Sequence, residues 1–292
     1  MTVEPGTIPT KDLHQFILAA VAPRPIAFAS TVSADGVPNL APYSFFNAFS
    51  SNPPILIFSS NRRVANNTTK DTLANVEATG EVVINVVSHH IARQMALCSI
   101  EWGAEVDEFR KSGLTPLPSE RVRPFRVAES PVQMECRVDK ILPLGKEGGA
   151  GNLIVCEILL MHIADEILTA TGRIDPHKID LVGRMGRFYY ARASGAAVEE
   201  IVQEVGAVGA LGFDRLPDFL LKNDVLTGNN LAELAALPAL PSPKEAAALA
   251  ADPEVGAALA SENPRAALLQ LAKKALDKKD VARGAQLAVL AA

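Results

Sequence analysis

Short apolar runs separated by turn residues fill the N-terminal part of this chain, and they limit its fold more than any other feature. The runs at residues 26–32 and 37–44 flank a tight turn that ends in Asp35-Gly36. An Asp-Gly pair favours the positive φ angles of hairpin turns, so we expect the two runs to pair as antiparallel strands. A β-sheet is therefore the predicted centre of the fold.

Four further runs extend this predicted sheet. Two prolines lead into a short apolar run at 55–59, and residues 81–87 form another. The runs at 131–142 and 153–164 flank a glycine-rich turn, which predicts a second, longer hairpin. Between the first hairpin and the third run, we expect residues 45–51 to be extended or looping chain.

Hydroxyl and charged residues mark the start of a predicted helix after the third strand. Residues 68–72, Thr-Thr-Lys-Asp-Thr, precede a helical pattern that Gly80 ends. The unpaired N–H groups of a first helical turn attract anions, Lys70 adds a full positive charge, and Thr72 or Thr69 adds a hydroxyl donor. The alternative is that this cluster only caps the helix.

Two arginines, Arg62 and Arg63, lie on the loop just before this helix. A guanidinium group presents a planar fork that matches the oxygens of a phosphate. The alternative is that both arginines face solvent. Together with the strands before them, these residues suit a ligand that is flat and apolar at one end and anionic at the other. A flavin nucleotide has that shape.

Composition argues against several classes of function. The chain has 292 residues, a formal net charge of −5 and a pI near 5.6, so it lacks the basic excess typical of nucleic-acid binding. Three widely spaced cysteines, Cys98, Cys136 and Cys156, argue against a disulfide framework or a four-cysteine zinc site and indicate a reducing cytoplasm. No run reaches the roughly 18 apolar residues of a membrane span, and no targeting pattern opens the chain. We expect a soluble, cytoplasmic protein without nucleic-acid or membrane partners.

The histidines predict no metal site. His89-His90 ends a strand, where adjacent side chains point to opposite faces, and no known metal-binding spacing surrounds it. His162 lies near the end of the run at 153–164. A lone strand histidine is more often packed or solvent-facing than functional, although an imidazole can donate a proton near neutral pH.

The composition changes near residue 195. β-branched and aromatic runs precede this point, whereas Ala and Leu dominate after it. Three cap-and-proline patterns, at Ser242-Pro243, Asp252-Pro253 and Asn263-Pro264, predict starts of short helices. We therefore predict a β-rich domain over residues 1–194 and a helical C-terminal extension over residues 195–292.

Four segments together resemble the flavin reductase-like family. They are PRPIAFASTVSADGVPNLAPYSFFNAFSSNPPILIFSS, NRR, KDTLANVEATGEVVINVV and VGRMGRFYY, and the match covers roughly residues 10–192. The resemblance implies a mainly β (α+β) fold, a six-stranded antiparallel FMN-binding split barrel with flanking helices. It also implies a homodimer with FMN in a groove near the dimer interface. Members reduce flavin with NADH or NADPH, and many pass reduced flavin to a partner monooxygenase.

The resemblance also implies which residues hold the cofactor. The ring and ribityl chain should lie against Thr31, Ser44, Phe45, Phe46 and Asn47, with Ser59 at the following strand end. The phosphate should be held by Arg62 or Arg63 with Lys70 and Thr72. His162 occupies the late strand where related proteins often place a histidine near the flavin, and it is the candidate catalytic residue. The chain departs from the family at Gly186-Arg187, where paired glycines are common, and at Phe28, where tryptophan is frequent.

These observations favour an FMN-dependent NAD(P)H reductase. Hydride transfer to a flavin requires few side chains because the cofactor supplies the chemistry, so the lack of a Ser-His-Asp signature does not argue against an enzyme. Two alternatives stay open. One is a flavoredoxin-like electron carrier that holds FMN permanently, and the other is a pyridoxamine-phosphate-oxidase-like flavoenzyme on the same barrel.

Overall fold

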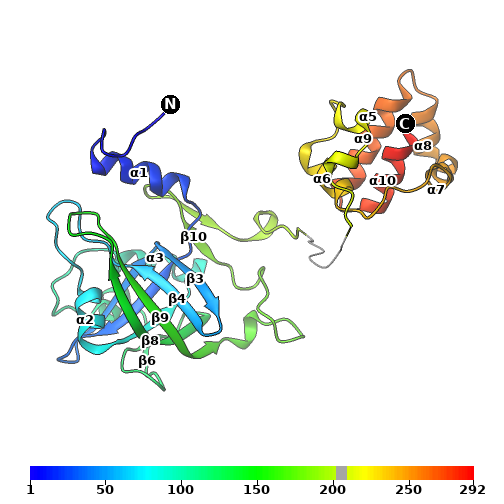
Figure 1. Cartoon of the computed structure of the whole chain (residues 1–292). Helices are drawn as coiled ribbons and strands as arrows, with labels where there is room; N and C mark the ends of the chain where they lie inside the picture. The colour runs from blue at the N-terminus through cyan, green and yellow to red at the C-terminus, as the bar shows by residue number, and fades with distance from the viewer. Residues whose placement is uncertain (202–208) are drawn as a thin grey trace. The chain divides into compact units, whose positions relative to one another are not determined.

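The chain divides into two compact units, Met1–Glu200 and Ile201–Ala292, and each is described by itself (Figure 1). The structure is a computed structural model, and it describes residues 1–201 and 209–292. The change in composition predicted a boundary at residue 195, and the two units separate a few residues beyond that point.

A seven-stranded antiparallel sheet forms the first unit, in the order β2-β1-β5-β8-β9-β4-β3. The edge strands β2 and β3 follow each other in the chain, and only Ser44 and Phe45 lie between them. The sheet must therefore curl until its two edges approach, although they do not pair, so the barrel is not closed. The strands are β1 (Ala27–Val32), β2 (Pro38–Tyr43), β3 (Phe46–Ser51), β4 (Pro54–Ser59), β5 (Glu81–Asn85), β8 (Val132–Pro143) and β9 (Asn152–Ile163).

The expectation of six strands is wrong, because residues 46–51 form the seventh. This segment, expected to be extended or looping chain, pairs with β4 as strand β3. All but its first residue are exposed, as in an edge strand with one free side. Its sequence, FNAFSS, lacks a regular alternation of apolar and polar residues, so only the pairing with β4 reveals it as a strand.

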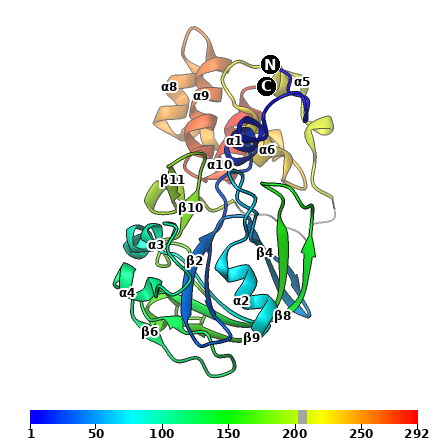
Figure 2. The ribbon, with the colours of Figure 1, turned by 90° about the vertical axis from the view of Figure 1, so that its left-hand side faces the viewer.

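Helix α2 (Asp71–Thr79) packs on the sheet through one apolar face. Leu73 and Val76 lie in a core cluster with residues of β1, β4, β5, β8 and β9. Gly80 ends the helix with a φ angle of 68°, which the sequence predicted because glycine adopts this left-handed conformation without strain. Figure 2 shows α2 beside the strands. The start of α2 is therefore fixed close to the ends of β2 and β4.

Smaller elements surround the sheet. A two-stranded hairpin, β10 and β11, attaches to the chain before β1 through paired backbone hydrogen bonds between Arg184 and Arg24 at 2.8 and 2.9 Å. The others are helices α1 (Thr10–Ala20), α3 (Ala92–Leu97) and α4 (Glu108–Ser112), strands β6 (Pro116–Leu117), β7 (Arg126–Val127), β10 (Val182–Arg184) and β11 (Tyr190–Arg192), and the 3₁₀ turns η1 (His89–Ile91), η2 (Asp165–Ile167) and η3 (Gly195–Ala197).

The second unit is helical and has its own apolar core. The three predicted cap positions are confirmed, since Ser242, Asp252 and Asn263 each accept a backbone N–H of the following helix. Its helices are α5 (Asp218–Leu221), α6 (Gly228–Ala235), α7 (Pro243–Ala247), α8 (Pro253–Leu259), α9 (Pro264–Leu276) and α10 (Val281–Leu290), with 3₁₀ turns η4 (Phe213–Arg215) and η5 (Ala248–Ala251). Across the described residues, every helix is too short or too polar to cross a membrane.

Candidate functional site

The first turn of α2 carries no side-chain cap from any described residue. Its N-cap is Lys70, with extended backbone angles, instead of the Ser, Thr, Asp or Asn that usually accepts a hydrogen bond there. Unpaired N–H groups at a helix start bear partial positive charge and attract anions. The capping alternative left open by the sequence therefore does not describe this helix.

Lys70 is a half-buried cation at this site that forms no ion pair with any described residue. Burial, and then the neighbouring Arg63, lower the pKa of Lys70. Its Nζ lies 4.9 Å from the centre of the Tyr43 ring, and no described residue forms a hydrogen bond or an ion pair with it. A bound anion would restore the favourable environment that burial removes from this ammonium group.

Arg62 and Arg63 hold the loop that leads into α2. Arg62 donates from Nε to Asn67 Oδ1 and from Nη2 to the Asn67 carbonyl, both at 2.6 Å. Arg63 Nε lies 2.7 Å from Glu101 Oε1, and its Nη1 donates to Thr68 Oγ1 at 3.0 Å. Both guanidinium groups add positive potential, but each is already engaged in fixing the loop.

Two buried hydroxyls beside this loop have no partner. Among the residues described, none forms a hydrogen bond with Tyr43 Oη or Ser60 Oγ. The hydroxyls of Ser60 and Thr72 neighbour Tyr43, without hydrogen-bonding geometry, and burial raises the pKa of Tyr43 to about 12. Asn152 fixes Ser60 by exchanging hydrogen bonds with its backbone at 2.9 and 3.1 Å. Buried hydroxyls are normally paired, so this pair marks a place built for a further acceptor.

A helix start without a side-chain cap, a half-buried lysine without an ion-pair partner and two unpaired hydroxyls among the described residues fit the phosphate of a nucleotide. Ser60 and Tyr43 were not among the predicted residues. Ser60 is the second member of the Ser59-Ser60 doublet, and Tyr43 ends β2 immediately before the predicted Ser44. The serine doublet and the end of β2 were the sequence signals for these two residues. The alternation of side chains along a strand does not say whether Ser59 or Ser60 points inward.

Thr31 and Thr72 lie in a buried polar network. Both hydroxyls donate to Asn39 Oδ1, at 3.2 and 2.8 Å, and Asn75 Nδ2 donates to Thr31 at 3.0 Å. Asn39 Nδ2 in turn donates to the buried carboxylate of Glu108 at 3.2 Å. These two threonine hydroxyls therefore tie α2 to β1 and β2. Asn39, Asn75 and Glu108 were missed because a tertiary network leaves no local pattern in a sequence.

The residues predicted for the ring end gather around the link between β2 and β3. Ser44, Phe45 and Phe46 are half-buried there, and Ser59 joins them because its N–H donates to the Phe45 carbonyl at 2.9 Å. The Ser59 hydroxyl donates to Asn61 Oδ1 at 2.7 Å. Asn47 is exposed on β3, and its Oδ1 accepts the N–H of Ala48 at 2.8 Å. The link thus offers an apolar surface with polar groups along one side.

Arg24 organises this ring end and was not predicted. Its side chain is buried, donates to Ser44 Oγ at 3.4 Å and to the Met185 carbonyl at 3.2 Å, and lies 5.9 Å from the Phe45 ring centre. It also donates to the carbonyls of Leu18 and Val21 at the end of α1. One guanidinium therefore joins α1, the β2–β3 link and the β10–β11 hairpin. The only feature of the sequence that distinguished Arg24 was its position between Pro23 and Pro25.

The model of the flavin reductase like domain matches residues 20–178, which is more than half of the chain. This chain belongs to the flavin reductase-like family.

Two solved structures and one sequence relative resemble this chain over nearly all of their own length. Component B of nitrilotriacetate monooxygenase from Bacillus cereus is 27% identical with a TM-score of 0.63, covering 70% of this chain and 98% of its own. A 2-nitrobenzoate 2-nitroreductase from Pseudomonas fluorescens is 25% identical with a TM-score of 0.62, covering 72% of this chain and 100% of its own. An uncharacterized protein from Aquifex aeolicus is 39% identical over 183 residues, covering 63% of this chain and 91% of its own. More than a quarter of this chain therefore lies outside each match.

His162 does not lie with the other predicted residues of this flavin reductase-like unit. It lies ten residues along β9 from Asn152, or about 33 Å at roughly 3.3 Å per residue. Its Nε2 lies 2.7 Å from Oε1 of the fully buried Glu135. It lines a cavity of about 510 Å³ at that end of the strand. Within one chain, His162 is therefore separate from Ser60 and the start of α2.

Glu135 is an ionised carboxylate held by its neighbours. Burial opposes its ionisation, but hydrogen bonds from the backbone N–H groups of Glu120 and Arg121 and from His162 more than offset this, so the pKa of Glu135 lies below its usual value. This arrangement fixes the His162 ring and the chain near residue 120. In the described ranges, 1–201 and 209–292, no group of three or more His, Cys, Asp or Glu residues could hold a metal ion.

Proposed function

We propose that this protein binds FMN and reduces it with NADH or NADPH. The single observation that carries the proposal is the start of α2, where no side chain caps the first turn, Lys70 lies 4.9 Å from the Tyr43 ring centre, and the buried hydroxyls of Tyr43 and Ser60 have no partner among the described residues. Bound FMN would supply the hydride-accepting ring, whose electronic properties belong to the cofactor.

The chain's own residues bind and orient this cofactor. Lys70 and the first turn of α2 hold the phosphate, and the residues of the β2–β3 link lie against the ring. Arg24 keeps this link in place through Ser44 and Phe45. The buried network around Asn39 sets the distance between the helix start and the strands. Side chains that neighbouring residues hold in fixed positions can align a cofactor without a dedicated acid or base.

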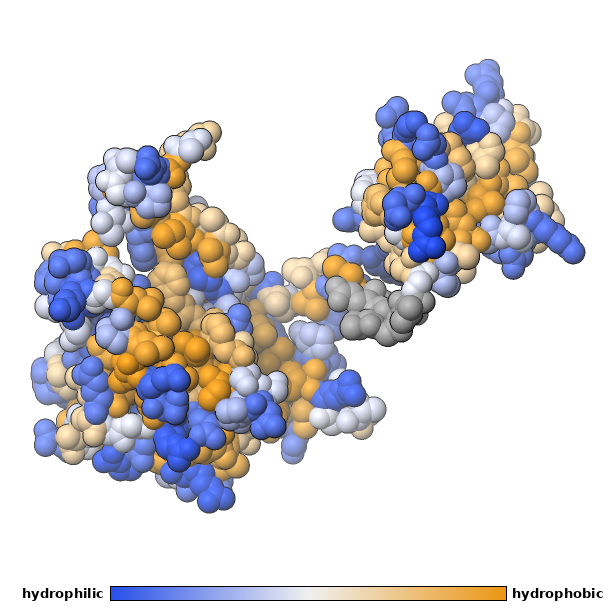
Figure 3. Space-filling model, in the orientation of Figure 1, coloured by the Kyte–Doolittle hydropathy of each residue, from blue (hydrophilic) through white to orange (hydrophobic). Residues whose placement is uncertain are grey.

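Exposed apolar residues and one of the relatives suggest two partners, a second copy of this chain and a monooxygenase. Leu159, Met161 and Ile163 alternate along β9 with their side chains exposed, and Phe49 is exposed on β3. Figure 3 shows hydrophobic surface gathered over these strands. Contiguous apolar surface of this kind marks protein interfaces, and we propose a homodimer formed through it. Since the Bacillus cereus relative is a monooxygenase component, we propose that a partner monooxygenase receives the reduced flavin.

The state of the cysteines bears on the cell compartment in which the protein works. All three, Cys98, Cys136 and Cys156, are buried free thiols. Free thiols persist in reducing compartments, and we therefore propose that the protein works in the cytoplasm.

Flavin titration of the Lys70→Ala variant tests the phosphate site. Loss of a charge-assisted contact to phosphate should raise the dissociation constant for FMN by about tenfold or more. Lys244→Ala, which removes an exposed lysine from α7 of the second unit, is the control and should bind FMN as the native protein does. Equal affinity in the Lys70 variant and the native protein would remove the phosphate assignment.

Oxidation of NADH and NADPH by the FMN-loaded native protein tests the reaction. Turnover with either nucleotide is expected. Bound flavin that neither nucleotide reduces would instead identify a flavoredoxin-like carrier, and a protein with no affinity for FMN would overturn the whole proposal.

A further inference from the structure

A second cavity, of about 540 Å³, lies between the β10–β11 hairpin and the segment formed by η1 and α3. It contains none of the residues assigned to the flavin. Its lining combines small apolar residues, the rings of a phenylalanine and a tyrosine, two histidines and two arginines: His89, His90, Ala92, Arg93, Ala96, Val182, Phe188, Tyr190, Ala191 and Arg192.

The two faces of the hairpin have different roles. Gly183 pairs with Ala191, and a Cβ atom on Gly183 would come within 2.8 Å of Pro23, so the hairpin packs against the chain before β1 at Gly183. Val182, Tyr190 and Arg192 belong to the opposite face, because adjacent strand residues alternate. This second face turns toward α3 and forms one wall of the cavity.

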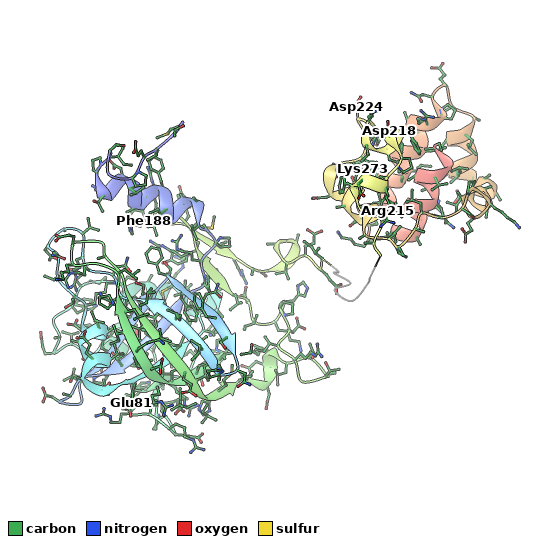
Figure 4. The ribbon with its side chains drawn as sticks, in the orientation of Figure 1. Glu81, Phe188, Arg215, Asp218, Asp224 and Lys273 are labelled. Carbon is green, nitrogen blue, oxygen red and sulfur yellow. The ribbon has the colours of Figure 1, made fainter. Side chains whose placement is uncertain are left out.

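Two aromatic rings border the cavity. Phe188 is 91% exposed at the tip of the hairpin (Figure 4), and Tyr190 is 37% exposed on β11. The Arg184 guanidinium lies 4.6 Å from the centre of the Tyr190 ring and steadies it. Ala92 and Ala96 of α3 are small, so a flat ring can approach the helix closely. An exposed phenylalanine beside such a floor offers a stacking surface for a planar ligand.

The charged rim favours an anion. Arg192 is paired with Asp180 through two contacts of 2.7 and 2.8 Å, so the two charges cancel. Arg93 is exposed on α3, and none of the residues that the structure describes pairs with its guanidinium. His89 and His90 lie on the same rim. A planar ring with an attached phosphate matches an aromatic wall beside an unpaired arginine.

We propose that this cavity binds the adenosine diphosphate half of NADH or NADPH, an inference that rests on the proposed reductase function. The cavity lies near the ring end of the flavin site. β11 pairs with β10, and β10 pairs at Arg184 with Arg24, whose side chain contacts Ser44. Two strand spacings, about 10 Å, separate β11 from Arg24. A dinucleotide held by its adenosine end in the cavity can therefore extend its nicotinamide toward the β2–β3 link.

Steady-state kinetics and calorimetry of two variants test this site in the FMN-loaded protein. Arg93→Ala removes a phosphate contact and Phe188→Ala removes a stacking surface, and each should raise KM for the pyridine nucleotide about tenfold with little change in kcat. ADP should bind the native protein, compete with the pyridine nucleotide, and bind the Arg93 variant about tenfold more weakly by calorimetry. Arg110→Ala, which removes an exposed arginine from α4, is the matched control and should match the native protein.

Each other outcome overturns the assignment in a recognisable way. A native protein that oxidises NADH or NADPH, with unchanged KM in both variants, would overturn this site and leave the proposed function standing. ADP binding that depends on Arg93 but does not compete with the pyridine nucleotide would identify a site for a free nucleotide instead. A native protein that oxidises neither nucleotide would overturn the proposed function first, and this inference with it.

Discussion

At the scale of single residues, a Tyr43 variant distinguishes a ligand-binding role of this side chain from a purely structural one. Its hydroxyl is buried without a partner in the described chain, so Tyr43→Phe should leave the free energy of unfolding of the ligand-free protein unchanged or slightly higher. FMN binding should weaken about fivefold, because one hydrogen bond of about 1 kcal/mol is lost. Denaturant unfolding and flavin titration measure the two effects.

Ser30 supplies the matched control for Tyr43. Its hydroxyl is also buried and unpaired within the described residues, but its side chain points to the opposite face of β1 from that of Thr31, which contacts α2. Ser30→Ala should therefore leave FMN affinity unchanged. If Tyr43→Phe destabilised the free protein by several kcal/mol, its hydroxyl would have a structural partner and the argument for the site would fail.

The pKa of Tyr43 also sets a pH dependence. It is raised to about 12, above the value near 10 of an unfolded tyrosine. Below pH 10 the group is protonated in both states and its contribution to stability is fully present. Between pH 10 and 12 only the unfolded state loses the proton, so stability should fall there by about 2 to 3 kcal/mol. In Tyr43→Phe, unfolding curves across this range should lack that fall, and an unchanged fall would contradict the assignment.

At the scale of elements, Asn39 joins α2 to the sheet. Its side-chain oxygen accepts from Thr31 and Thr72, and its amide donates to Glu108. Asn39→Ala would leave these buried groups without partners, which should lower the free energy of unfolding by about 2 to 4 kcal/mol. FMN affinity should fall as well, since the helix start is no longer held at a fixed distance from β2. Chemical denaturation and flavin titration check both.

Asn229→Ala is the control for this change. Asn229 is exposed in α6 of the second unit, so its truncation should alter neither stability nor flavin affinity. An Asn39 variant that was destabilised but bound FMN normally would show that the network supports the fold without positioning the phosphate site.

At the scale of the whole molecule, the two units have separate cores. Among the described residues, the buried apolar side chains of the first unit form two clusters and those of the second unit form another, and none of these three clusters combines residues of both units. A fragment of residues 1–200 should therefore fold, bind FMN with the affinity of the full chain and sediment at twice its own mass. Thermal unfolding, flavin titration and analytical ultracentrifugation test these expectations.

Two results would contradict this account of the whole molecule. An unfolded fragment would mean that the helical unit is needed to complete the first core. A folded fragment that sediments as a monomer at micromolar concentration would contradict the homodimer proposed from the exposed residues of β3 and β9.

The sequence by itself determined the local features of this protein. The Asp35-Gly36 turn, the glycine that ends α2 and the caps of three C-terminal helices all depend on neighbours within a few residues, so they could be predicted. The residues of the flavin reductase-like motif also placed Lys70 and Ser44 in the candidate site. The turn and the caps form through interactions within a few residues, whereas Lys70 and Ser44 were assigned from the resemblance of the motif.

Only the tertiary structure decided which side chains meet. Strand β3 exists because β4 offers it a hydrogen-bonding edge, and its own sequence shows no strand alternation. Thr31 and Thr72 share one acceptor on Asn39, whereas the unpredicted Tyr43 and Ser60 supply the free hydroxyls. His162 lies far from the phosphate site because β9 is twelve residues long. These outcomes depend on contacts between distant segments, and the energy of such contacts is set by packing that no local pattern encodes.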